Sequence, residues 1–136
     1  MKYFWTLLML VGIACTQSAH AEEPLLDPEV AFRVEASMAQ SGVIDLRWKV
    51  VDGYYLYRKK LEFKLPQACA HNGAELPAGK IKNDEFFGKM EVYRTDFAAR
   101  VRHSGCTPSQ IEVTYQGCSD LGVCFPPVTS TLAVAG

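Results

Sequence analysis

The sequence predicts an all-β domain, an antiparallel β-sandwich of immunoglobulin-like type. Three observations support this prediction. Apolar and polar residues alternate with a period of two in several short segments, as in strands with one buried face. Turn signals recur roughly every ten residues between these segments. Beyond residue 21, no segment shows the 3.6-residue periodicity of an amphipathic helix.

The N-terminus has the features of a secretory signal peptide. A basic residue precedes the apolar run 3–14, which is shorter than the ~20 residues of a transmembrane helix, and residues 19–21 form a small-x-small cleavage site. We therefore expect residues 1–21 to be cleaved and residues 22–136 to form one exported domain. A lipoprotein signal that ends at Cys15 is the alternative, although the Gly-Ile-Ala before it lacks the usual leucine.

The clearest strand pattern lies at residues 43–50, where an apolar face alternates with a charged one. The apolar face carries Ile44, Leu46, Trp48 and Val50. An Asp-Gly turn follows, the aromatic run 54–57 restarts a strand, and residues 61–65 alternate again until Pro66.

The rest of the domain contains four more predicted strands, at residues 91–94, 97–102, 111–116 and 128–134. We expect the last of these to be an edge strand because two prolines precede it. Residues 66–83 are rich in Pro, Gly, Ala and Asn and predict a long irregular connection. Residues 22–29, with two prolines among acidic residues, predict an extended lead-in.

Composition and charge exclude several classes of protein. The expected mature chain has the size of one domain, and it contains no second apolar segment of transmembrane length. A net charge of −1 leaves no basic footprint for nucleic acid and no polybasic patch for a membrane surface.

Four of the five cysteines follow the signal, and thiols of an exported domain are usually paired. Three connectivities are possible. Cys118 and Cys124 would close a ring small enough for a tight hairpin, whereas Cys69 and Cys106 would close a long loop. On the chain-entropy model the short ring stabilises the fold by ~2.4 kcal/mol and the long one by ~3.9 kcal/mol. The Cys69–Cys106 link is the better structural staple, and opening the Cys118–Cys124 link costs the fold less stability.

A reachable disulfide in a small ring is a candidate for thiol–disulfide exchange, but two alternatives stay open. The pair could be an inert hairpin disulfide in an immunoglobulin-like binding module. It could also bind or deliver a metal together with His103 and Cys106, although no second closely spaced ligand pair is present. No Cys-x-x-Cys motif and no cation within the cysteine loop acidify the thiols, so reaction would depend on a docked partner.

Three segments resemble one known family. The segment 115–127, Tyr-Gln-Gly-Cys-Ser-Asp-Leu-Gly-Val-Cys-Phe-Pro-Pro, resembles the active-site segment of the N-terminal periplasmic domain of the thiol:disulfide interchange protein DsbD. The segment 52–59 resembles the aromatic strand of that family, and the segment 84–94 resembles its cap loop. The three motifs occur in the family's order and together cover most of residues 30–134.

The resemblance implies a fold and a set of site residues. The fold is immunoglobulin-like, without cofactor or metal, and a cap loop shields the cysteines until a partner docks. Cys124 is then the nucleophile that forms mixed disulfides, and Cys118 resolves them. The remaining site residues are Phe86 and Phe87 in the cap, with Asp84, Glu85, Tyr55 and Tyr57 near the sulfurs. Carboxylates there would disfavour a thiolate and could relay a proton.

The resemblance also implies partners. A thioredoxin-like C-terminal domain supplies the electrons, and periplasmic disulfide isomerases such as DsbC receive them, which makes the domain a protein-disulfide reductase. A carrier of this kind should expose Cys124 faster when Phe86 is replaced by alanine, whereas an inert staple should be indifferent.

The chain departs from the family pattern in two respects. Family members continue into a membrane domain and a thioredoxin-like domain. A chain of 136 residues is then either part of a longer membrane protein or a free-standing, monomeric homologue. Cys69 and Cys106 do not belong to the family pattern, and we expect a second, structural disulfide between them.

Overall fold

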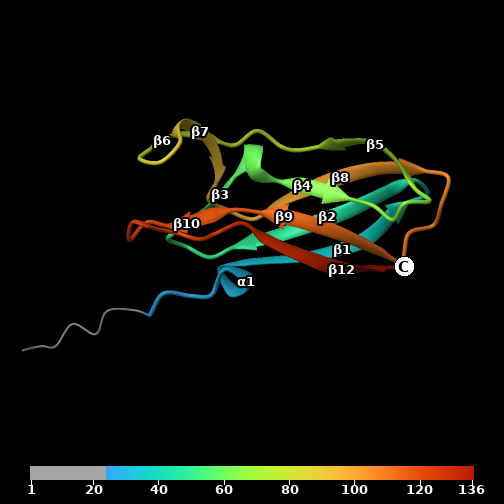
Figure 1. The fold of residues 1–136 in the computed structure, drawn as a ribbon, viewed down its shortest axis with the longest axis horizontal. Coiled ribbons are helices and arrows are strands. Elements are labelled where there is room, and N and C mark those ends of the chain that lie inside the picture. Colours follow the sequence, from blue (N-terminus) through green and yellow to red (C-terminus); the bar gives the residue numbers. More distant parts are fainter. Residues whose placement is uncertain (1–23) are drawn as a thin grey trace, which may run out of the picture.

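Two β-sheets make up most of the computed structural model, which describes residues 24–136 (Figure 1). One sheet has seven strands in the order β4 (Glu62–Lys64), β9 (Gln110–Tyr115), β12 (Val128–Ala135), β1 (Phe32–Gln40), β2 (Val43–Val50), β8 (Phe97–Ser104) and β5 (Ala70–Glu75). The other has five strands in the order β11 (Val123–Cys124), β10 (Gly117–Ser119), β3 (Tyr54–Tyr57), β7 (Gly88–Tyr93) and β6 (Lys80–Asp84). The helical turns α1 (Pro28–Ala31) and η1 (Arg58–Lys60) complete the elements. The predicted immunoglobulin-like β-sandwich is confirmed.

The N-terminal predictions fall largely outside the described residues. The expected signal peptide, residues 1–21, and the alternative lipoprotein cysteine Cys15 precede them. Within residues 24–136, none of the helices is long and apolar enough to cross a membrane.

The main core is built from the alternating residues of the central strands. All four residues of the apolar face predicted for β2 are buried. Trp48 stacks on Phe97 with ring centroids 5.1 Å apart, and Phe97 stacks in turn on Tyr93 of the other sheet at 3.9 Å. Aromatic pairs of this kind contribute ~0.5–1.5 kcal/mol each beyond the area that they bury. The stack therefore ties the two sheets together.

Strand β3 is buried on both of its faces. Tyr54 and Leu56 belong to the main core, whereas Tyr55 and Tyr57 belong to a second, smaller cluster with Cys118. The alternation of the strand sends successive side chains to opposite faces of the sheet. A strand that buries two tyrosines outside the main core needs a cover over them, and in this fold the cover is the segment that follows β6.

The prediction of an irregular connection over residues 66–83 is wrong, because β5 and the first four residues of β6 lie within it. β5 is an edge strand whose register shifts between His71 and Ala74. Five of its six residues are exposed, so it shows no apolar alternation. Strand β1, which we did not predict, does alternate: Phe32, Val34, Ala36 and Met38 contribute to the main core, and polar residues stand between them.

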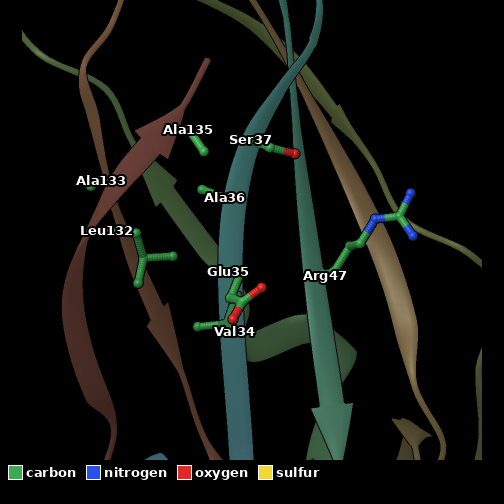
Figure 2. Close-up of a pocket in the computed structure, with 8 residues that line it drawn as sticks. All are labelled: Val34, Glu35, Ala36, Ser37, Arg47, Leu132, Ala133 and Ala135. Atoms are coloured by element: carbon green, nitrogen blue, oxygen red, sulfur yellow. The ribbon is translucent and has the colours of Figure 1, made fainter.

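The prediction that residues 128–134 form an edge strand is also wrong. β12 lies between β9 and β1, and it pairs with β1 in parallel through Ala36 and Val134 and through Ser37 and Ala135. The sandwich is therefore antiparallel except at this one pair of strands in its described part. A shallow hollow of about 340 Å³ lies over the pair, beside Glu35, Arg47 and Ala133 (Figure 2). No cysteine lines it.

The structure pairs Cys69 with Cys106, with Cα atoms 5.1 Å apart. Cys69 directly precedes β5, and Cys106 follows β8, the neighbouring strand. The bond therefore closes the edge of the seven-stranded sheet, whereas β10 and β11 belong to the five-stranded sheet.

Removal of this bond should cost stability without affecting redox chemistry elsewhere. We expect the double variant Cys69→Ala/Cys106→Ala to lose ~2–4 kcal/mol of unfolding free energy, since its unfolded chain is no longer cross-linked over a long loop. Urea unfolding of the oxidised protein measures this loss. Unchanged stability would contradict the role of a staple.

Candidate active site

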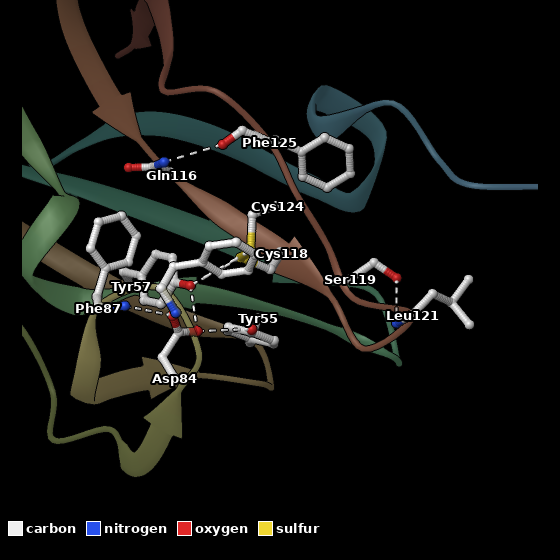
Figure 3. The surroundings of a disulfide bond; sticks show 11 residues. Tyr55, Tyr57, Asp84, Phe87, Gln116, Cys118, Ser119, Leu121, Cys124 and Phe125 are labelled. Carbon is white, nitrogen blue, oxygen red and sulfur yellow. Dashed lines mark hydrogen bonds between the residues drawn. A yellow bond between two sulfur atoms is a disulfide. The ribbon is translucent and has the colours of Figure 1, made fainter.

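Cys118 and Cys124 face each other across a short hairpin, which we call the cysteine hairpin (residues 117–124). Strands β10 and β11 pair so that the two residues lie in register, with Cα atoms 4.0 Å apart and a disulfide between the sulfurs (Figure 3). Gly122, at a φ of +85°, forms the turn, and its amide donates to the carbonyl of Ser119 at 3.1 Å. The left-handed conformation at this position favours glycine.

Gly117 allows the hairpin to lie against β3. A Cβ atom at this position would lie 2.5 Å from the carbonyl oxygen of Tyr55 and 2.5 Å from the ring of Phe32. A backbone oxygen cannot move aside, so only glycine fits. The close approach places Cys118 directly opposite Tyr55 in the ladder.

The two sulfurs differ in access. Cys118 is fully buried, whereas Cys124 is half-buried. Cys124 lines a small hollow of about 80 Å³ together with Phe86 and Lys82, which we call the Cys124 hollow. A partner that approaches from solvent therefore meets Cys124 first.

Hydroxyl groups from β3 connect the sulfurs to a buried carboxylate. The Tyr57 hydroxyl donates to Asp84 at 2.6 Å, and the same oxygen lies 3.0 Å from the sulfur of Cys118 and 3.8 Å from that of Cys124 (Figure 3). The Tyr55 hydroxyl donates to the same carboxylate oxygen at 3.2 Å.

The ionisation of these groups follows from burial and hydrogen bonding. Burial, with hydrogen bonds to Asp84 and Tyr55, raises the pKa of Tyr57, so its hydroxyl stays protonated. Burial by itself would raise the pKa of Asp84. Hydrogen bonds from Tyr57, from two backbone amides and from Tyr55 outweigh this effect and leave the pKa of Asp84 below its usual value. The site therefore holds a carboxylate and a neutral phenol.

The same carboxylate shapes the cap loop, the segment 84–89. The second oxygen of Asp84 accepts from the amides of Phe86 at 2.8 Å and Phe87 at 3.0 Å, which closes a tight turn. The ring of Phe87 meets that of Tyr57 edge-to-face at 5.2 Å. Phe86 borders the Cys124 hollow, yet its side chain is 62% exposed. Glu85 borders the hollow too, and it is exposed.

The predicted site residues thus lie in one place, but not all of them touch the sulfurs. Tyr57 contacts both, and Asp84 accepts a hydrogen bond from it. Phe87 packs on Tyr57, while Phe86 and Glu85 lie at the rim of the hollow. The roles assigned to these residues remain predictions.

Sequence reasoning missed three cations beside the site. Lys82 and Arg94 lie 5.2 and 4.8 Å from the ring centroid of Tyr55, and Lys60 lies 4.5 Å from that of Phe87. The cysteine loop itself carries no cation, but neighbouring elements supply these three. Their positions in the sequence carry no periodic signal that would reveal them. Arg94 also binds Asp120, at the hairpin tip, through two contacts of 3.0 Å.

The metal-binding alternative loses its ligands. Cys106 is bonded to Cys69, and His103 is buried in β8. Within residues 24–136, no three side chains of His, Cys, Asp or Glu gather into a group that could hold a metal ion.

Comparison with known proteins agrees with the geometry of the site. The family model described as "Thiol:disulfide interchange protein DsbD, N-terminal" matches residues 22–136. The chain belongs to this family of DsbD N-terminal domains. DsbD of Pseudomonas sp. (strain JR1 / K1) is 37% identical over 134 residues, and DsbD of Neisseria meningitidis serogroup A is 36% identical over 135. Each alignment covers 98% of this chain but only 22% of the relative's length.

Two solved structures from Neisseria meningitidis extend the likeness to DsbD N-terminal domains. The domain in its reduced form superposes with a TM-score of 0.72 at 32% identity, covering 82% of this chain and 90% of that one. A complex between the DsbD and PilB N-terminal domains superposes with a TM-score of 0.65 at 32% identity, covering 82% and 88%.

Proposed function

We propose that this domain carries reducing equivalents by opening and closing its Cys118–Cys124 disulfide. The donor is a thioredoxin-like domain, and the acceptors are disulfide isomerase-type proteins such as DsbC, which makes the domain a protein-disulfide reductase. The observation that carries the proposal is the cysteine hairpin itself. Its sulfurs differ in access, Cys124 shares a hollow with Phe86 of the cap loop, and the second disulfide lies at the edge of the other sheet. The neisserial complex with the PilB N-terminal domain supports a protein as the partner.

The exchange takes place in two balanced steps. The thiolate of Cys124 attacks the partner's disulfide, so that a mixed disulfide forms and one partner thiolate leaves. Cys118 then attacks the sulfur of Cys124, which closes the domain's disulfide and releases the second partner thiolate. Two electrons pass to the partner, and the two protons lost by the cysteines balance the two thiolates.

Tyr57 and Asp84 control the proton of Cys118. Because the Tyr57 hydroxyl donates to Asp84, it presents a lone pair to Cys118 3.0 Å away. The reduced Cys118 therefore donates its thiol proton to Tyr57, which favours the thiol over the thiolate. Cys118 thus remains a protonated thiol until it attacks the sulfur of Cys124. Its proton then moves through Tyr57 toward the carboxylate of Asp84.

The site of action follows from the N-terminus and from the relatives. A signal peptide at residues 1–21 would export the domain to the periplasm. Since the DsbD relatives are about five times longer than the matched segment, we place the domain in a longer membrane protein.

The reduction potential of the Cys118–Cys124 disulfide tests the proposal. We expect a value of about −270 to −120 mV in glutathione or dithiothreitol redox buffers, the range of exchange proteins, with Cys69 and Cys106 still oxidised. A value below about −300 mV would instead indicate a structural disulfide and favour an inert binding module.

Replacing Phe86 with alanine separates a cap from an inert loop. We expect the reduced variant to react severalfold faster with iodoacetamide at Cys124, because Phe86 borders the hollow beside that sulfur. The free energy of unfolding should change by less than ~0.5 kcal/mol, since the ring is mostly exposed. An unchanged alkylation rate would mean that Phe86 does not shield the site.

A further inference from the structure

Two lysine ammonium groups near the cysteine site, one at the Cys124 hollow and one against the cap loop, have no acidic partner. Lys82 lines the hollow and lies over the ring of Tyr55, while Lys60 lies over the ring of Phe87 in the cap loop. Each of the five ion pairs within residues 24–136 uses an arginine, so neither lysine takes part in one.

The other charges around the site, apart from one exposed carboxylate, are held in ion pairs or buried. Arg58 pairs with Glu91 at 3.1 Å, and Arg94 pairs with Asp120 at 3.0 Å. Asp84 is buried beneath hydroxyl and amide donors. Of the residues that line the hollow, only Glu85 leaves an exposed, unpaired negative charge against these lysines. Among the exposed, unpaired charges around the site, two lysine ammonium groups therefore face one carboxylate, although the chain as a whole carries a charge of −1.

The aromatic rings position the two lysine ammonium groups without neutralising their charge. A ring attracts an ammonium through its quadrupole, and it restricts the lysine side chain without supplying a neutralising charge or a hydrogen-bond acceptor. The two ammonium groups are thus positioned over the site while their charge remains available. A protein that reaches Cys124 must bring its own surface next to them.

We propose that Lys60 and Lys82 form a basic docking rim for a protein partner whose cysteine pair is flanked by carboxylates. The inference rests on the proposed exchange function and names the chemistry of the partner's surface. Opposite charges on the two surfaces speed the encounter, and a partner with lysines beside its cysteines is repelled.

A pair of peptides tests the rim. Each peptide carries the same Cys-x-x-Cys disulfide, flanked in one by two glutamates and in the other by two lysines. The reduced domain converts the peptide disulfide to two thiols while its own cysteines form a disulfide, so electrons and protons balance. We expect wild type to reduce the glutamate peptide about tenfold faster than the lysine peptide at low ionic strength, and this ratio should shrink as salt screens the charges.

Variants that remove the lysine charges test whether the preference for the glutamate peptide comes from the rim. The double variant Lys60→Gln/Lys82→Gln should bring the ratio of the two rates close to one. Lys49→Gln/Lys64→Gln, which removes two exposed lysines from the other sheet, should keep the wild-type ratio. A ratio is measured because it is insensitive to changes in sulfur reactivity or in the fraction folded.

The outcomes separate the two proposals. Equal rates on both peptides in wild type, or a ratio that persists in the rim variant, would overturn the docking rim and leave the exchange function intact. Failure of the wild-type domain to reduce either peptide would overturn the exchange function and the rim with it.

Discussion

Replacing Cys124 with alanine is expected to abolish exchange, whereas replacing Cys118 should stop it half-way. Cys124 is the half-buried sulfur that borders the hollow, and Cys118 is fully buried. The Cys118→Ala variant keeps the accessible nucleophile but lacks the thiol that resolves the mixed disulfide. It should therefore accumulate a covalent adduct with a partner protein, while Cys124→Ala should form none and reduce nothing above the background of the buffer.

The adduct can be measured directly. Each reduced variant is mixed with the oxidised PilB N-terminal domain of Neisseria meningitidis and analysed by intact mass spectrometry without reductant. The control is Cys69→Ala/Cys106→Ala, which retains the cysteine hairpin and should exchange like wild type. An adduct on Cys118, or persistent exchange in Cys124→Ala, would reverse the assigned roles.

Replacing Asp84 with alanine should cost ~2–4 kcal/mol of unfolding free energy, since buried donors lose their only charged acceptor. The hydroxyls of Tyr55 and Tyr57 and the amides of the cap turn all donate to this carboxylate. The cap turn should loosen at the same time, and Cys124 of the reduced variant should then react faster with iodoacetamide. The matched control is Glu85→Ala, one residue on and exposed, which should change stability by less than ~0.5 kcal/mol.

The effect of Asp84 should also depend on pH. Its pKa in the folded state lies below the usual value, because the hydrogen bonds to it outweigh its burial. Its contribution is then fully present above the unfolded pKa of about 3.9 and is lost as the pH falls through the folded value. Urea unfolding should show the gap between wild type and Asp84→Ala closing at the acidic end. A gap that stays constant down to the lowest pH would mean that the charge of Asp84 is not what stabilises the cap.

The strands whose sequences alternate most clearly share one physical property, although β1 alternates too and was not recognised. β2 and β9 each have one face in the main core, so burial imposes a period of two that is visible without a structure. β5 is mostly exposed and interrupted by a register shift, so nothing in its sequence alternates. The position of β12 was missed for a different reason. Its pairing with β1 depends on two segments about a hundred residues apart, and two prolines near its start suggest an edge.

The same distinction applies to the site. Cys118 and Cys124 could be paired from their spacing, because a six-residue separation suits a hairpin. The contact of Tyr57 with Cys118 spans 61 positions, and only a resemblance to a family suggested it. Lys60 and Lys82 went unnoticed because a charged residue on a loop or strand is usually solvated, and only the packed rings reveal where these two point.

The course of β12 determines how the domain would be tethered. The strand begins four residues after Cys124 and runs eight residues to Ala135, so it carries the chain ~25 Å away from the cysteines at ~3.3 Å per residue. The C-terminus therefore emerges at the end of the molecule opposite the site (Figure 1). In a longer protein, a linker attached at the C-terminal end would hold the domain by the end opposite the site. The sulfurs would then face away from the point of attachment. Electron donor and acceptor would then compete for the same exposed cysteine hairpin. The length of the linker would set the effective concentration of a tethered donor at that hairpin.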